Sequence, residues 1–141
     1  MRISEAQAKV ILGRFYVAPT AKTAQKSKRP KQPSVGELEL IRHLHVHKIP
    51  YEREFKFAEH RRWRADFLIT GTRILIEVEG GIFSNGRHTR GTGYTKDCEK
   101  YNWAASNNWL LLRFTTAQVQ SGAALDAIVK TLENQGSKYD Y

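Results

Sequence analysis

Residues 62–79 have the sequence RWRADFLITGTRILIEVE, in which two runs of alternating character flank a Thr-Gly-Thr segment. Side chains of a β-strand point alternately to its two faces, so the pattern predicts strands at 62–69 and 73–79. Gly71 suits the first position of a two-residue type II′ turn, which predicts that the two strands form a hairpin. The first strand is expected to place Trp63, Ala65, Phe67 and Ile69 on one face and Arg62, Arg64, Asp66 and Leu68 on the other.

This hairpin would bring carboxylates together. Pairing Thr70 with Arg73 across the turn also pairs Asp66 with Glu77, and Glu79 lies on the same face. Like charges opposite each other on a sheet destabilise it by up to ~1 kcal/mol, so the pattern needs a compensating factor. A few carboxylates with room for water and a phosphate oxygen suit Mg²⁺ or Mn²⁺. The alternative is a solvated face on which the acids pair with neighbouring arginines.

The elements predicted on either side of the hairpin complete the order αβββαβα. A capping-box pattern at Ser34 and Glu37 predicts the start of the first helix, because each side chain can satisfy the other residue's backbone N–H group. Five glycines between Gly80 and Gly93 predict a loop after the hairpin. The helices and strands predicted outside the hairpin are 34–47, 52–57, 94–107, 109–114 and 123–134.

The positive charge of the chain is concentrated near its N-terminus. The 141 residues carry a net charge of +9, of which residues 1–33, with eight Lys and Arg and one Glu, hold +7. Their content of Lys, Pro, Ser and Thr predicts a flexible arm, with a short helix at 4–14, joined to a single domain at 34–141. A basic arm is typical of proteins that bind polyanions, with nucleic acid as the first candidate and a solubilising extension as the alternative.

The composition argues against a membrane or secreted protein. No apolar run approaches the ~20 residues of a membrane span, and the start MRISEAQAKV has no apolar signal region. The lone Cys98 cannot form an internal disulfide, which fits a reducing compartment. We therefore expect a cytoplasmic protein with no membrane partner and no nucleotide cofactor.

The carboxylate pattern resembles that of a known nuclease superfamily. Asp66, ten further residues and then Glu77-Val78-Glu79 in an apolar strand resemble the PD-(D/E)XK nuclease core. Between residues 34 and 132 the chain is similar to small phage and prophage endonuclease-domain proteins related to very short patch repair endonucleases. The similar segments are IEVEGG at 76–81, GRHTRG at 86–91, DCEKYN at 97–102 and WLLLRFT at 109–115.

This resemblance implies both a fold and an activity. The fold would be α/β, with an αβββαβ core in which helices flank a central mixed four-stranded sheet. The activity would be metal-dependent hydrolysis of DNA phosphodiester bonds that leaves a 5′-phosphate, carried out by a phage or prophage protein in the cytoplasm of a bacterial host. Mg²⁺ would be the cofactor, with Mn²⁺ able to replace it.

The resemblance also implies metal ligands. Asp66 and Glu77 would bind the metal through their side chains and Val78 through its carbonyl. Glu37 corresponds to an acid of the first helix that completes or supports the site in many of these nucleases. Its role in the capping box is the competing explanation.

The residue that activates water stays open, because Glu79 stands where the motif usually has lysine. Glu79 could deprotonate the water or bind a second metal. A lysine could instead enter from another element, and Lys100 on the helix after the loop is the candidate. The competing explanation is a surface ion pair between Lys100 and Asp97, which stand three residues apart on that helix.

The glycine-rich loop leaves the end of the carboxylate strand and carries basic residues. Arginine makes bidentate phosphate contacts, and His88 could donate a proton to the leaving oxygen. A loop with solvated charges is the alternative. The residues expected to contact nucleic acid are Arg62, Arg64, Arg87, Arg90 and Lys96.

Two functions therefore remain from the sequence. The first is a metal-dependent DNA endonuclease, with mismatch nicking, junction cleavage and nonspecific cleavage all open. The second is a non-catalytic nucleic-acid-binding module on the same fold. The oligomeric state is open as well, with a homodimer as one option.

Overall fold

The structure, a computed structural model, describes residues 31–80 and 90–136. The predicted helix at 4–14 and the side chains of Arg87 and His88 lie outside the described residues. Arg90 is described as the first residue of a helix, but its side chain is not.

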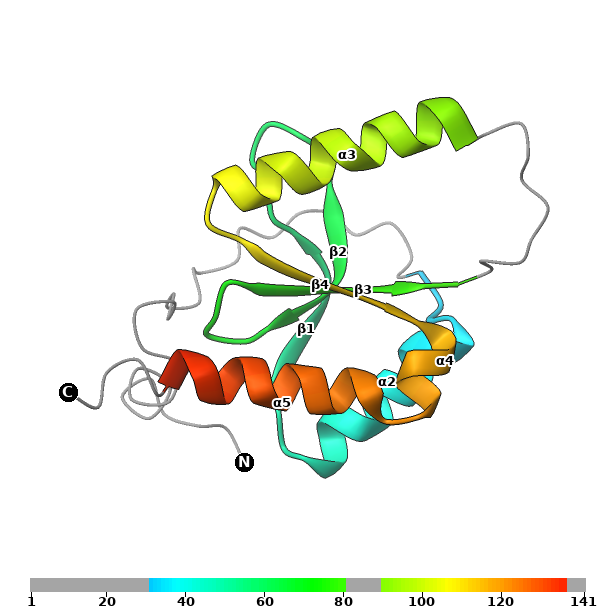
Figure 1. Cartoon of the computed structure of the whole chain (residues 1–141), viewed down its shortest axis with the longest axis vertical. Coiled ribbons are helices and arrows are strands. Elements are labelled where there is room, and N and C mark those ends of the chain that lie inside the picture. Colours follow the sequence, from blue (N-terminus) through cyan, green and yellow to red (C-terminus); the bar gives the residue numbers. More distant parts are fainter. Residues whose placement is uncertain (1–30, 81–89, 137–141) are drawn as a thin grey trace.

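The chain forms a four-stranded sheet with helices on both sides (Figure 1). The strand order is β1-β2-β3-β4, in which β1 and β2 are antiparallel, β2 and β3 are antiparallel, and β3 and β4 are parallel. This mixed sheet confirms the predicted α/β fold class. The elements are α2 (Val35–Val46), β1 (Tyr51–Lys56), β2 (Arg64–Ile69), β3 (Ile74–Glu79), α3 (Arg90–Ser106), β4 (Leu110–Thr115), α4 (Thr116–Gln120) and α5 (Ala123–Gly136).

Two differences from the predicted elements concern helices. The helix predicted to begin at Tyr94 begins at Arg90, so the loop before it is shorter than expected. The short helix α4 was not predicted, although its N-terminus carries a capping box between Thr115 and Gln118 that the sequence displays. With α4 the order becomes αβββαβαα.

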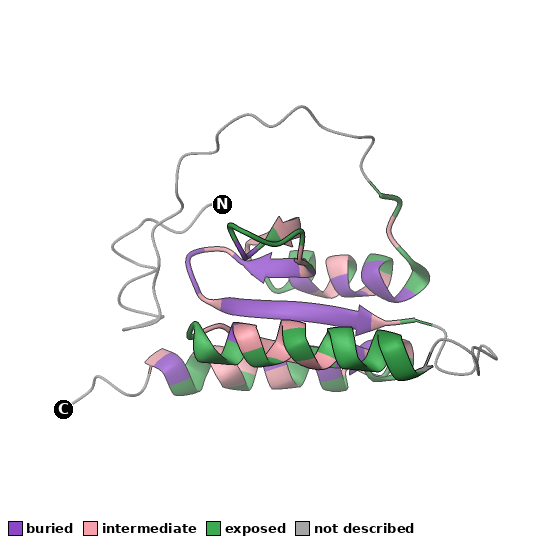
Figure 2. Cartoon of the chain, turned by 90° about the horizontal axis from the view of Figure 1, so that it is seen from above, coloured by how far each residue is buried: buried purple, intermediate pink, exposed green. Residues whose placement is uncertain are grey.

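The sheet separates two apolar clusters. Its strands are largely buried, whereas the helices each have an exposed side (Figure 2). Helices α2, α4 and α5 cover one face of the sheet and α3 covers the other (Figure 1). The first cluster is Leu40, Leu44, Phe67, Ile69, Ile74, Ile76, Val78, Phe114, Val119, Ala124 and Ile128. The second cluster, beneath α3, is Phe57, Ala58, Ala65, Leu68, Leu75 and Ala104, with the three tryptophans packed against it.

Helix α2 begins at the predicted capping box and approaches the sheet closely. Ser34 Oγ accepts from Glu37 N and Glu37 Oε2 accepts from Ser34 N, both at 3.2 Å. A Cβ on Gly36 would lie 2.8 Å from Val78 Cγ1 and 2.8 Å from Thr116 Oγ1. Glycine at this position therefore allows α2 to bring Glu37 up to the carboxylate strand.

The β2–β3 hairpin has the predicted register but a different turn. Phe67 pairs with Ile76 and Leu68 with Leu75, as the predicted pairing requires. The turn is closed by Thr72 N–H donating to Ile69 O at 3.1 Å, which places Gly71 at its third position with φ +80°. The type II′ prediction was therefore wrong, because a glycine with positive φ suits several turns and their hydrogen bonds are not visible in the sequence.

The strand faces reverse once, between the two ends of the β1–β2 pair. Ala65 packs in the cluster beneath α3, whereas Phe67, two residues later, packs in the opposite cluster. The prediction that Trp63 and Ala65 share a face with Phe67 was therefore wrong. The reversal lies opposite Glu54, whose φ of +51° interrupts the regular alternation of β1.

Candidate functional site

Asp66 lies where β2 separates from β3. The last backbone pair of the two strands is Phe67 with Ile76, and beyond it the Asp66 carboxylate accepts a hydrogen bond from Val78 N–H at 2.8 Å. In this register Asp66 falls opposite Glu77, as predicted. The two carboxylates nevertheless have different partners, which relieves the like-charge contact that the sequence suggested.

The surroundings of Asp66 include both acids and bases. Burial raises the pKa of the Asp66 carboxyl above its ordinary value, and the hydrogen bond from Val78 N–H lowers it. The negative charge of Glu37 raises the pKa further, and the ammonium groups of Lys31 and Lys100 lower it. Asp66 is thus an acid whose negative charge is only partly compensated, between a lysine on each side.

Glu37 lies on the α2 side of this group and is almost fully buried, with 3% exposure. Besides its capping hydrogen bond to Ser34, its carboxylate lies 3.7 Å from Lys31 Nζ and 3.6 Å from an Arg53 guanidinium nitrogen. The capping role is therefore present, and the same carboxylate also contributes to the electrostatics of Asp66.

Glu77 lies on the α3 side and has a donor on each carboxylate oxygen. Lys100 Nζ contacts Oε1, and the Tyr101 hydroxyl donates to Oε2 at 2.8 Å. Burial raises the pKa of Tyr101, and the hydrogen bond to Glu77 raises it further, so the hydroxyl stays a donor. The sequence-predicted lysine is thus in contact with a sequence-predicted carboxylate, and Glu77 is the ion-pair partner that the structure gives it.

Glu79 is paired outside this group. Arg113 of β4 donates through Nε to Glu79 Oε1 at 2.9 Å, and its guanidinium lies 4.2 Å from the centre of the Tyr101 ring. Among residues 31–80 and 90–136, no three Asp, Glu, His or Cys side chains are grouped so that they could hold a metal ion. The predicted three-carboxylate cluster is therefore not preassembled, because Glu77 and Glu79 each bind a base from a neighbouring element.

The remaining predicted nucleic-acid contacts are dispersed. Arg64 is exposed at the start of β2, Arg62 is exposed just before that strand, and Lys96 is exposed on α3. Arg87 and His88 belong to the segment that the structure does not describe.

Sequence reasoning did not identify five residues of this network. Lys31, Arg53, Tyr101 and Arg113 contact the acids, and Glu54 contacts Lys31. The Lys31 ammonium lies 3.9 Å from the Glu54 carboxylate, in addition to its contact with Glu37. Tyr101 and Arg113 reach the carboxylates from α3 and β4, so no local spacing connects them to β3. For Tyr101 the one available signal was its position next to Lys100.

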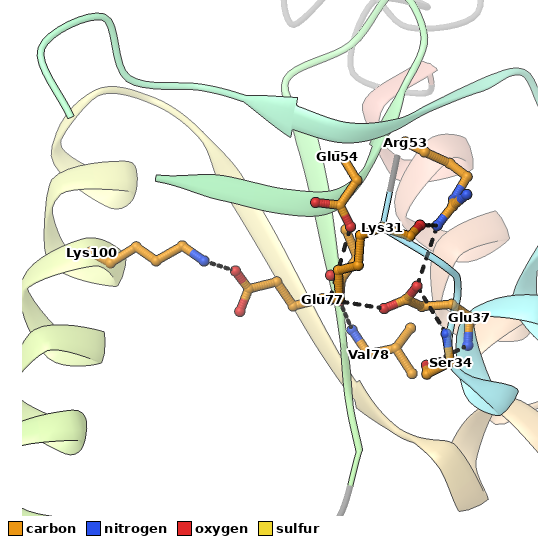
Figure 3. A network of polar contacts seen from close by, with 9 residues as sticks. Lys31, Ser34, Glu37, Arg53, Glu54, Glu77, Val78 and Lys100 are labelled. Atoms are coloured by element: carbon orange, nitrogen blue, oxygen red, sulfur yellow. Dashed lines mark hydrogen bonds and ion pairs between the residues drawn. The ribbon is translucent and has the colours of Figure 1, made fainter. Parts of the chain in front are cut away.

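Together the carboxylates extend from Glu37 on the α2 side to Glu77 on the α3 side, with a lysine at each end of the group. Figure 3 shows Glu77 pointing to Lys100 on one side, while Lys31 lies between Glu37 and Glu54 on the other. The basic side chains show that this region can hold positive charge. Carboxylate oxygens are the ligands that a hard divalent cation prefers. Carboxylates and lysines are also residues that can transfer a proton to or from water in a hydrolase.

The described helices include none that is long and apolar enough to cross a membrane. The fold is similar to a solved structure, the catalytic domain of the homing endonuclease I-Bth0305I. That likeness has a TM-score of 0.53 and 16% sequence identity, and covers 77% of this chain and 100% of the other. At this identity the likeness concerns the fold. No family model and no curated protein matches the chain, so the resemblance to PD-(D/E)XK and very short patch repair endonucleases stays a prediction.

Proposed function

We propose that this protein is a metal-dependent DNA endonuclease. The observation that carries the proposal is the position of Asp66 and Glu77 at the point where β2 and β3 separate. Lys100 forms an ion pair with Glu77 there and lowers the pKa of Asp66. A nuclease-like fold with two acids and a lysine at a strand opening is a suitable arrangement for phosphodiester hydrolysis. The basic N-terminal arm supports DNA as the substrate.

The residues present fit a divalent cation. Mg²⁺ is commonly bound through one or two carboxylates together with waters and substrate phosphates, so a preassembled group of three acids is not required. Lys100 already places a positive charge at Glu77 and near Asp66. Asp66 and Glu77, with the Val78 carbonyl, would hold Mg²⁺ or Mn²⁺, and Glu37 would support Asp66 from the α2 side.

The bound metal would polarise the scissile phosphate and lower the pKa of the attacking water. Lys100 would carry the proton or orient the water, since its ammonium contacts Glu77 and also lowers the pKa of Asp66. The ion pair with Arg113 gives Glu79 a structural partner, which favours Lys100 over Glu79 in this role. His88 and Arg90 would act on the phosphate from the loop side, and Arg62, Arg64, Arg87 and Lys96 would hold the DNA backbone.

The test is cleavage of supercoiled, linear, single-stranded, branched and mismatched DNA with Mg²⁺ or with EDTA. We expect Mg²⁺-dependent cleavage of at least one substrate with 5′-phosphate products, and loss of cleavage in Glu77→Gln. Glu99→Gln is the matched control. Glu99 is an exposed acid of α3 whose carboxylate lies 2.9 Å from the Arg61 guanidinium, and it is not one of the proposed ligands. Binding to DNA without cleavage of any substrate would favour the non-catalytic module instead.

A further inference from the structure

The proposed reaction gives no role to Lys31, although its ammonium lies among the acids of the site. Its Nζ is 3.7 Å from Glu37 Oε1 and 3.9 Å from Glu54 Oε1 (Figure 3). It also interacts electrostatically with Asp66. One ammonium therefore compensates three carboxylates on the α2 side of the proposed metal ligands.

Glu54 is the least expected of these carboxylates. It lies opposite Asp66 in the β1–β2 register, at the pair that the ladder omits. Its φ of +51° is rarely adopted by a residue with a side chain, and such backbone persists only where surrounding contacts fix it. Its Oε1 is buried without a hydrogen-bond partner, so Lys31 at 3.9 Å is the charge that compensates it.

Lys31 is held by one exposed backbone hydrogen bond and by two long ion pairs. An Arg53 guanidinium nitrogen donates to Lys31 O at 3.3 Å and also lies 3.6 Å from Glu37. The Lys31 side chain is 64% exposed, and both of its ion pairs are longer than a hydrogen bond. The ammonium can therefore leave once another positive charge compensates Glu37 and Glu54.

We propose that Lys31 is a resident counter-ion of the acidic site, held there by Glu37 and by Glu54 as an additional site residue, and that a divalent cation displaces it. The proposal rests on the proposed metal site at Asp66 and Glu77. A divalent cation beside Asp66 repels the ammonium and takes over its role as counter-charge. Metal binding and Lys31 docking therefore oppose each other, and by linkage each weakens the other.

The first test measures Mn²⁺ binding by titration calorimetry on the full chain without DNA. Lys31→Met should bind Mn²⁺ about fivefold more tightly or better, because the metal no longer competes with the ammonium. Lys56→Met is the control for loss of a nearby positive charge. Lys56 is an exposed residue at the end of β1 whose Nζ donates to Glu59 O at 3.1 Å, and its removal should leave the affinity unchanged.

The second test follows trypsin cleavage after Lys31, a bond that is protected while the side chain is docked. Mn²⁺ should speed cleavage at Lys31 several-fold over the rate in EDTA. The bonds after Lys26 and Lys28 serve as internal references for protease activity, and their rates should not change. Glu54→Gln should speed cleavage at Lys31 without Mn²⁺, because the ammonium loses one of its two ion-pair partners.

The outcomes separate this proposal from the metal site on which it rests. Tighter Mn²⁺ binding by Lys31→Met together with Mn²⁺-dependent exposure of Lys31 supports it, as does Mn²⁺ binding seen in Lys31→Met alone. Mn²⁺ binding by the parent with equal affinity in Lys31→Met and no change at Lys31 overturns it and leaves the metal site standing. No Mn²⁺ binding by either protein overturns both.

Discussion

Each of the three acids proposed for the site has a different kind of hydrogen-bond partner. Asp66 accepts a hydrogen bond from Val78 N–H, and Glu37 accepts one from the N–H of Ser34, the N-cap residue of its helix. Glu77 accepts from the Lys100 ammonium and from the Tyr101 hydroxyl. A carboxylate that keeps one fixed donor retains its orientation while its other lone pairs stay available. Asp66, with its one backbone donor, therefore combines a fixed orientation with free lone pairs, whereas Glu77 has a donor on each oxygen.

Asp66→Asn should abolish cleavage and stabilise the metal-free protein. The raised pKa of Asp66, caused first by burial, means that the folded chain binds a proton more readily than the unfolded chain. The stability of the parent therefore falls as the pH rises through the range between the ordinary value of 3.8 and the higher folded value. The asparagine oxygen can still accept from Val78 N–H. We expect a higher melting temperature at pH 7 in EDTA, and cleavage reduced by roughly 100-fold or more.

The stabilising effect should disappear in acid, where Asp66 is protonated in both states. Thermal unfolding of parent and variant from pH 3 to pH 8 measures this difference. Lower stability of Asp66→Asn at pH 7 would contradict the assignment of burial as the main influence on Asp66.

Lys100→Met should separate structural from chemical roles of the ammonium. The lysine and Glu77 side chains are only 17% and 11% exposed, so loss of the pair should cost roughly 1–3 kcal/mol of stability. We expect the single-turnover rate to fall by ~100-fold. Lys100→Arg should restore stability without restoring the rate, because arginine keeps the charge and does not release a proton.

Tyr101→Phe provides the matched comparison, since it removes the other donor to Glu77 and keeps the ring beside Arg113. Its rate should fall less than that of Lys100→Met. Equal losses in the two variants would indicate that Lys100 only orients Glu77.

At the scale of elements, the site depends on how closely α2 approaches β3. Gly36→Ala should destabilise the protein by about 1–3 kcal/mol, because the new Cβ would meet Val78 and Thr116 at 2.8 Å. Gly93→Ala is the control in α3, where a Cβ would meet no atom within 4 Å. That change should be neutral or stabilising by up to ~1 kcal/mol. Chemical denaturation of both variants gives the comparison, and equal stabilities would argue against the tight contact.

The segment between β3 and α3 is the second element for which we predict a role in cleavage, since it connects Glu79 to Arg90. His88→Ala and Arg90→Ala should each lower the single-turnover rate by ~100-fold with little change in DNA affinity, if these side chains act in the transition state. Loss of affinity at an unchanged saturated rate would assign them to backbone binding. Measurement at saturating DNA distinguishes the two results.

At the scale of the whole molecule, α2 and α3 cover opposite faces of the sheet, and each contributes to the site from its own side (Figure 1). The acids are thus contacted from both sides of the sheet. Substrate affinity is expected to depend on charge outside those layers, because residues 1–30 contain seven of the 23 Lys and Arg.

Deletion of residues 1–30 should weaken DNA binding and flatten its salt dependence. The slope of log affinity against log salt becomes shallower by about 0.9 for each phosphate that the shortened protein no longer neutralises. Cleavage at saturating DNA should persist, since the deletion leaves the proposed ligands and Lys100 in place. Fluorescence anisotropy with labelled DNA from low to moderate salt measures the slope, and an unchanged slope would refute a role for the arm in binding.

Most of the architecture follows from local sequence patterns. The αβββαβ order, the capping box at Ser34 and the 67–76 register came from periodicity and turn residues, which act over a few positions. Lys100 was identified as a candidate because the motif lacked its usual lysine. These features depend on residues that are close together in the sequence, so they can be predicted without the tertiary structure.

The rest depended on contacts between distant segments. The positive φ of Glu54 reverses the strand faces and directs Asp66 toward the backbone of β3, which strict alternation cannot anticipate. Lys31, Tyr101 and Arg113 reach the acids from other elements. A charge pair forms wherever packing brings two side chains together, and its members share no spacing in the sequence. The sequence pattern thus identified the candidate acids, and only the tertiary packing decided which basic side chain each acid contacts.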